Sequence, residues 1–134
     1  MASIYVARSV SMNKWASDVG LGKLVFKLGV ADDDPKTLAA AGWAGESDWS
    51  IVKAEPVEGL SEDDAIDRLA AKERMIDPNL YPKLKGSRGV FRINPAKVEN
   101  HILVSRALAG ESDLKALKLK PADFAAYLIA NAKR

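Results

Sequence analysis

The stretch KLVFKLGV, residues 23–30, decides the fold class of this chain of 134 residues. Val25 has apolar neighbours on both sides, and this pattern is typical of a strand that is covered on both faces. The β-rich stretch at residues 4–7 predicts a strand before it, and residues 49–54 and 90–93 predict strands after it. The sequence therefore predicts a sheet of three to four strands.

Helices are expected between these strands, because the chain carries two strong signals for a helix start. Asp34-Pro35 and Asn94-Pro95 each place a capping side chain directly before a proline. An Asp or Asn side chain can accept a hydrogen bond from a free backbone N–H, and proline fits the first helical position. Each pair therefore predicts a helix that begins at its proline.

Three further helical segments are expected from weaker signals. Ser61 resembles the start of a capping box, and the apolar spacing after it predicts a helix that ends before Pro78. Residues 11–22 predict one or two helical turns that Gly20 ends. Pro121 is expected to begin the last helix.

These elements predict a small α+β domain with the order β-β-α-β-α-(β)-α-α, the strand in parentheses being the weakest. Residues 1–110 are expected to form this domain. Residues 111–134 are expected to form a C-terminal helical extension packed on it.

The residue types present exclude several classes of site. The chain has no cysteine, which excludes disulfides and thiolate metal sites. It has one histidine, His101, so a multi-histidine metal site cannot be built from this chain alone. No stretch reaches about 18 consecutive apolar residues, and the N-terminus lacks the pattern of an export signal, so a cytoplasmic protein without membrane contact is expected.

Charge is segregated along the chain, although the formal net charge is only +2. Residues 31–67 hold eleven acidic against two basic residues, and residues 68–134 hold fourteen basic against six acidic residues. A basic segment, residues 83–97, contains no acidic residue. Such a segment can bind phosphate groups, or it can face the acidic half of the same molecule.

Two short motifs resemble the paired motifs of the GIY-YIG nuclease superfamily. They are Ser3-Ile4-Tyr5 on the first predicted strand and Phe-Lys-Leu-Gly at residues 26–29 on the second. The lysine of the second motif is similar to one that the phage-type branch of that superfamily often carries. The order of elements is similar too, and the resemblance covers about residues 3–108.

The resemblance implies metal-assisted hydrolysis of a phosphodiester in active members, with Mg²⁺ or Mn²⁺ as the cofactor. It implies that Tyr5 assists the nucleophile, that Lys36 supplies positive charge, and that Glu73 holds the metal from a helix. Such chemistry needs a base, a cationic donor and a metal-bound carboxylate around one phosphorus. Phe26 stands where the family has its second tyrosine, and Lys36 stands where it has an arginine.

We therefore expect a GIY-YIG-like protein that binds DNA or RNA and has a degenerate nuclease site. The side chains expected to bind nucleic acid are basic and lie on the second strand and in the basic segment: Lys27, Lys83, Lys85, Arg88 and Arg92. Two alternatives stay open. One is an active, divalent-metal-dependent endonuclease, and the other is a protein-interaction module that does not contact nucleic acid.

Overall fold

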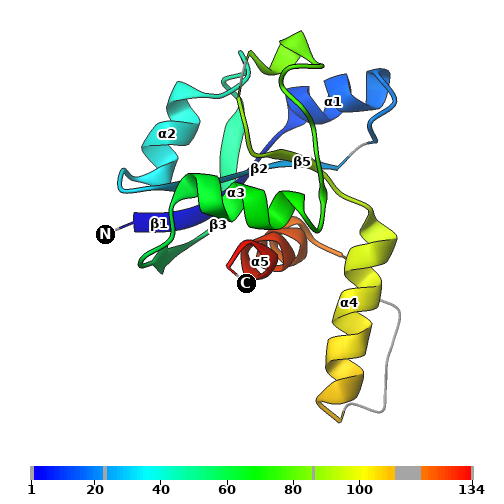
Figure 1. Cartoon of the computed structure of the whole chain (residues 1–134). Coiled ribbons are helices and arrows are strands. Elements are labelled where there is room, and N and C mark those ends of the chain that lie inside the picture. Colours follow the sequence, from blue (N-terminus) through cyan, green and yellow to red (C-terminus); the bar gives the residue numbers. More distant parts are fainter. Residues whose placement is uncertain (1, 23, 86, 111–118, 134) are drawn as a thin grey trace.

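A five-stranded antiparallel sheet forms the centre of the structure, a computed structural model that describes residues 2–22, 24–85, 87–110 and 119–133 (Figure 1). The strand order across the sheet is β3-β1-β2-β5-β4. The strands are β1 (Ala2–Ser9), β2 (Val25–Ala31), β3 (Trp49–Val57), β4 (Arg74–Met75) and β5 (Val90–Arg92). The α+β class predicted from the sequence is confirmed.

The pairing of β1 with β2 places the two sequence motifs side by side. Tyr5 lies directly opposite Gly29 in this pair. A Cβ atom at Gly29 would lie 2.3 Å from the Tyr5 hydroxyl oxygen and 2.4 Å from Cζ. Real Cβ atoms do not approach other atoms so closely, so the Tyr5 ring can cross β2 only because residue 29 is glycine.

Helices α3 (Glu62–Ala70) and α5 (Pro121–Ala132) cover one face of the sheet, and α5 lies beside α3 in Figure 1. Together they enclose the larger apolar core. Its sheet residues include Ile4, Val6, Phe26, Leu28 and Phe91, and its helix residues include Ala65, Ile66, Leu69, Phe124, Leu128 and Ile129. Because α5 supplies so many of these side chains, the fold needs this helix for its core.

Helices α1 (Val10–Asp18) and α2 (Pro35–Ala41) belong to the opposite face. The second apolar core lies there and includes Ala7, Met12, Ala16, Val25, Ala39, Trp49, Leu84 and Val90. Helix α4 (Pro95–Leu108) instead projects away from the sheet (Figure 1). Only Val98 of α4 is buried among its described side chains.

The predicted helix starts are confirmed by their capping contacts. Asp34 and Asn94 each accept a hydrogen bond from the backbone N–H two residues later, and proline follows each of them. Ser61 accepts from the N–H of Asp64, as a capping residue should. Helix α1 also begins at a capping serine, Ser9, which the sequence patterns did not indicate.

Two predictions about the elements are wrong. The sheet has five strands rather than three to four, because β4 is only two residues long and carries no periodic signal. The helix that begins after Ser61 ends at Ala70 instead of continuing to Pro78. Met75, predicted to lie on that helix, pairs with Phe91 of β5 and packs against the larger core. Burial against the sheet has overridden the local helical pattern here.

Candidate functional site

Tyr5, the predicted catalytic tyrosine, lies in the interior. Its side chain is 2% exposed, and its ring stacks on Trp43 with the centroids 5.8 Å apart. Burial, together with the negative charge of Glu62, raises the pKa of the Tyr5 hydroxyl to about 12. The hydroxyl is therefore protonated and enclosed at neutral pH.

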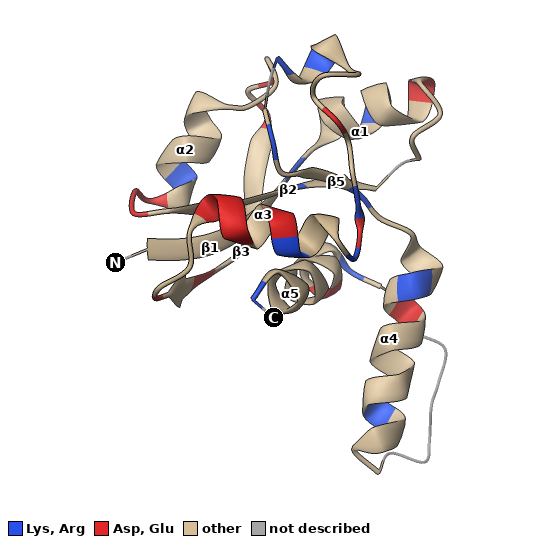
Figure 2. Ribbon diagram, in the orientation of Figure 1, with Lys and Arg blue, Asp and Glu red and all other residues tan. Residues whose placement is uncertain are grey.

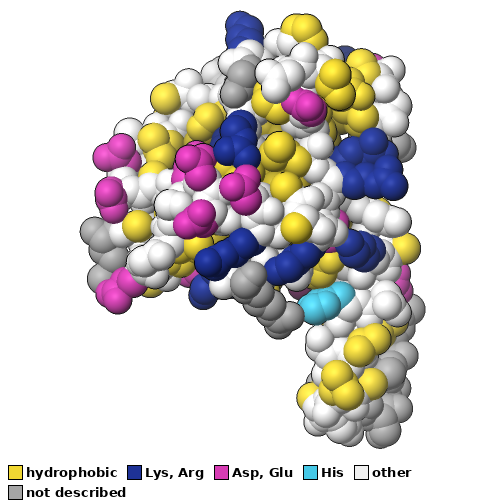
Figure 3. Space-filling model, in the orientation of Figure 1, with side chains coloured by type: hydrophobic (Ala, Val, Ile, Leu, Met, Phe, Trp, Pro, Cys, Tyr) yellow, Lys and Arg dark blue, Asp and Glu magenta, His cyan; other side chains and the backbone are white. Residues whose placement is uncertain are grey.

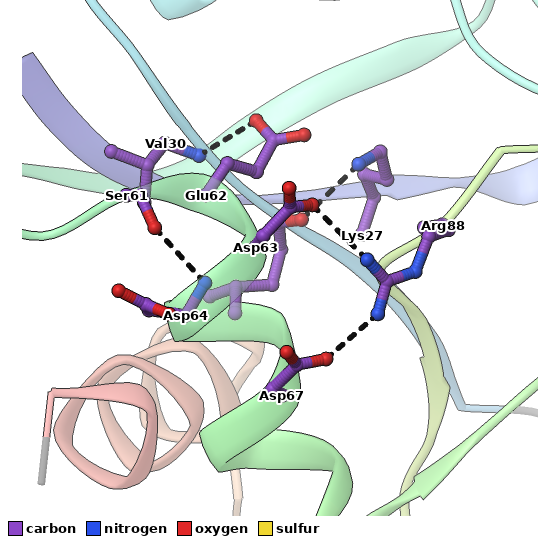
Figure 4. A network of polar contacts seen from close by, with 9 residues as sticks. Lys27, Val30, Ser61, Glu62, Asp63, Asp64, Asp67 and Arg88 are labelled. Atoms are coloured by element: carbon purple, nitrogen blue, oxygen red, sulfur yellow. Dashed lines mark hydrogen bonds and ion pairs between the residues drawn. The ribbon is translucent and has the colours of Figure 1, made fainter.

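Lys27 also lies in the interior, beside α3. It is 4% exposed, its Nζ donates to the Leu28 carbonyl at 3.1 Å, and it lies 5.6 Å from the centre of the Trp43 ring. Burial lowers the pKa of Lys27, the carboxylate of Glu62 opposes this shift, and the positive charge of Arg88 adds to it. Figure 4 shows Lys27 among these charged groups. Its ammonium group is not on the molecular surface.

Glu73, the predicted metal ligand, is 7% exposed and lies in the turn after α3. Its Oε1 accepts a hydrogen bond from the Tyr127 hydroxyl, and Lys97 Nζ lies 3.1 Å from the same oxygen. Burial first, and then Glu73, raise the pKa of the Tyr127 hydroxyl above its usual value. An ammonium group at this distance occupies the place of a cation, so these residues do not fit a divalent metal ion.

The two predicted catalytic residues, Tyr5 and Lys36, and the predicted metal ligand Glu73 do not form one site. Tyr5 packs on Trp43, which contacts the core on the α1 and α2 face of the sheet. Glu73 is bonded to Tyr127 of α5, which belongs to the core on the other face. Lys36 is exposed on α2. Among residues 2–22, 24–85, 87–110 and 119–133, no group of three or more His, Asp or Glu side chains could hold a metal ion.

Two cations of the basic segment pair with the acidic half of the molecule, which places acidic residues on α3 (Figure 2). Lys83 forms an ion pair with Glu46. Arg88 donates to Asp63 at 3.1 Å and to Asp67 at 2.9 Å, both on α3 (Figure 4). Figure 3 shows this face, with a basic side chain among several acidic ones above α5. These contacts support the second interpretation of the charge pattern. Lys85 is exposed beside the loop that contains Gly45.

Arg92 differs from the other predicted binding residues, because it lines a polar pocket that we call the basic pocket. This pocket has a volume of about 560 Å³ and lies at the β4 edge of the sheet. Four cationic side chains and one carboxylate line it, together with apolar and small residues and the cap of α4. The lining residues are Leu21, Gly22, Lys72, Glu73, Arg74, Arg92, Ile93, Asn94 and Lys97.

Arg74 and Arg92 lie directly opposite each other in the β4–β5 pair. Opposed residues of an antiparallel pair extend their side chains from the same face, about 5 Å apart at Cβ. Within the described part of the chain neither arginine has an ion-pair partner. Two like charges in this arrangement repel each other, and a bound anion would remove the repulsion.

The start of α4 adds to the positive potential of the basic pocket. Asn94 lines the pocket and caps this helix of 14 residues. The dipole of the helix gives its N-terminus partial positive charge, which favours an anion, although the Ala96 N–H is already bonded to Asn94. Figure 3 shows basic side chains in a row from below α3 to the first turn of α4. The pocket is therefore part of a wider basic surface.

Lys72, Arg74 and Lys97 were not among the predicted binding residues. Lys97 lies within the basic segment that contains no acidic residue, so the charge pattern alone could have indicated it as a binding residue. Lys72 and Arg74 lie outside that segment, in a stretch predicted to be helical. Only the pairing of β4 with β5 brings Arg74 to Arg92.

Comparison of the chain with protein-family models, with curated proteins and with solved structures finds no match. The resemblance to GIY-YIG nucleases therefore stays a prediction. In the described residues, no helix has both the length and the apolar character needed to span a bilayer.

Proposed function

We propose that this protein binds nucleic acid through the basic pocket and does not cleave it. The observation that carries the proposal is the opposed pair Arg74 and Arg92, which lacks an acidic partner in the described chain and lines a polar pocket. Phosphate groups are the anions that such arginines bind best, because the guanidinium group donates two parallel hydrogen bonds to phosphate oxygens.

A polyanion fits this surface better than a single phosphate. Lys72 and Lys97 line the same pocket as the two arginines, so the pocket carries positive charge on several sides, although Lys97 is paired with Glu73. Contacts to successive phosphates release counterions, and this release supplies most of the affinity of non-specific nucleic-acid binding. Glu73 offsets the charge of Lys97, with which it forms an ion pair, and leaves Arg74 and Arg92 without a carboxylate partner in the described chain.

No cleavage is expected, because the candidate catalytic groups are separated in the structure. Tyr5 is buried under Trp43, whereas Glu73 is held by Tyr127 on the other face of the sheet. Purified protein incubated with DNA or RNA and Mg²⁺ or Mn²⁺ should leave both intact. Cleavage that disappears in Glu73→Ala would contradict this part of the proposal.

Fluorescence anisotropy with labelled DNA and RNA oligonucleotides tests the binding. We expect Arg74→Gln and Arg92→Gln each to weaken binding roughly three- to tenfold at low salt. Arg8→Gln is the matched control, because Arg8 is an exposed arginine on β1 and does not line the pocket. Equal losses in all three variants would mean that general charge, rather than the pocket, determines the affinity.

A further inference from the structure

A second pocket adjoins the basic pocket, and we call it the apolar pocket. Its volume is about 440 Å³. The two pockets share four lining residues, Leu21, Glu73, Arg74 and Arg92. Because both arginines line both pockets, one ligand can contact them and extend into either space. The remaining residues that line the apolar pocket are Ala70, Met75, Ile76, Asp77, Leu80 and Tyr81.

The wall of the apolar pocket carries large side chains that are available to a ligand. Leu80 is 73% exposed, which is high for a large apolar side chain. Tyr81 is half-buried, and its ring meets the ring of Trp15 edge-on with the centroids 5.8 Å apart. This contact with α1 fixes the tyrosine, so its ring is a preformed surface on which a flat group can pack.

The two pockets together fit a ligand that joins an anion to a flat, mostly apolar group. A nucleotide has this structure, with a phosphate at one end and a base at the other. Each base has a π-face that packs on aromatic or aliphatic side chains with little dependence on sequence. In a duplex these faces are covered by neighbouring bases, and a base must be unpaired as well as unstacked before it can enter such a pocket.

We propose that the site binds an unpaired nucleotide, with its phosphate between Arg74 and Arg92 and its base against Leu80 and Tyr81. The protein then prefers single-stranded nucleic acid, or an unpaired end, over a blunt duplex. This inference rests on the proposed function, since it assigns the phosphate to the same pair of arginines. Asp77 also lines the apolar pocket; its Oδ1 accepts the backbone N–H of Asn79 at 2.8 Å, and its negative charge lowers the positive potential on that side.

Three labelled ligands test the inference: a single-stranded oligonucleotide, an abasic strand of equal length, and a blunt duplex. The abasic strand keeps the phosphates and lacks the bases. We expect it to bind roughly tenfold more weakly than the complete strand, because base stacking is lost. The duplex should also bind more weakly than the single strand, although its charge density is higher.

Leu80→Ala and Arg74→Gln separate the base contact from the phosphate contact. Leu80→Ala should weaken binding of the complete strand about fivefold and leave the abasic strand unchanged. Arg74→Gln should weaken both. If complete and abasic strands bind equally, the inference fails and the proposed function stands. If none of the three ligands binds in a salt-dependent manner, the proposed function fails as well. Leu80 is exposed, so its removal should leave the fold intact.

Discussion

Arg74 and Arg92 face each other across the β4–β5 pair, and no acidic side chain of the described residues pairs with either. Arg88, by contrast, forms ion pairs with both Asp63 and Asp67 of α3. The opposed arginines therefore mark a place where the fold tolerates electrostatic repulsion. A protein can retain such an arrangement when a ligand compensates it.

The repulsion predicts that removing one arginine stabilises the protein without ligand. We expect Arg74→Gln to raise the free energy of unfolding by about 0.2–1 kcal/mol at low ionic strength, because directly opposed like charges cost roughly this much. The gain should shrink in high salt, which screens exposed charges. Urea denaturation at two salt concentrations measures it, with Arg8→Gln as the control. A loss of stability in Arg74→Gln would contradict the repulsion.

The contact between Gly29 and Tyr5 predicts a large effect from a single methyl group. Gly29→Ala should lower the free energy of unfolding by about 1–3 kcal/mol, because the new Cβ would lie 2.3 Å from the Tyr5 hydroxyl oxygen. Thermal denaturation measures the loss. In a Tyr5→Ala background the same substitution should cost far less, since the ring is gone. Equal costs in both backgrounds would show that the ring is not the obstacle.

The bond from the Tyr127 hydroxyl to Glu73 predicts a structural role for this buried carboxylate. Tyr127→Phe should lower the free energy of unfolding by about 1–3 kcal/mol, because it leaves a buried charged group with one partner fewer. Tyr81→Phe is the matched control, since the structure shows no hydrogen bond from that hydroxyl within the described residues. If the two variants were equally stable, the bond would contribute nothing.

The burial of Lys27 predicts a pH-dependent gain from Lys27→Met. Burial lowers the pKa of Lys27 below 10.5, so at neutral pH its charge opposes folding and methionine should stabilise the protein. As pH rises from the folded pKa towards 10.5, the folded state loses the proton before the unfolded state does. The wild type then gains stability, and the advantage of Lys27→Met should shrink.

Urea denaturation of both proteins between about pH 7 and pH 10 measures this difference. Taking the difference between wild type and variant removes the contribution of groups that both proteins share, such as Tyr5. A gain that stayed constant across this range would contradict a lowered pKa. If the variant were less stable than the wild type at every pH, the contacts of Lys27 with Trp43 and Leu28 would stabilise the fold by more than the burial of its charge costs.

The elements predicted correctly are those that residues close together in the sequence determine. The helix starts at Asp34 and Asn94 follow from one capping side chain and one proline, and the structure confirms both. The strand at residues 23–30 follows from the apolar run at residues 24–26, and β2 occupies most of that stretch. Such signals need no knowledge of the rest of the fold.

Most of the candidate site could not be predicted from the sequence patterns, because contacts between residues far apart in the chain create it. Nothing near Arg88 in the chain reveals that Asp63 and Asp67 will neutralise it, 25 and 21 residues away. Nothing near Arg74 reveals a strand of two residues that places it opposite Arg92. Charge composition indicated that the basic segment either binds phosphates or faces the acidic half of the molecule, and long-range contacts determine which of its cations form ion pairs.

The dependence of affinity on salt tests the central claim most directly. Each phosphate contact made by a lysine or arginine contributes about 0.7 to the slope of log K against log salt for a single strand. We predict that the Arg74→Gln/Arg92→Gln double variant binds a single-stranded oligonucleotide more weakly, with a slope shallower by roughly 1.4 than that of the wild type. A slope equal to that of the wild type, with Arg8→Gln behaving in the same way, would contradict nucleic-acid binding at the basic pocket.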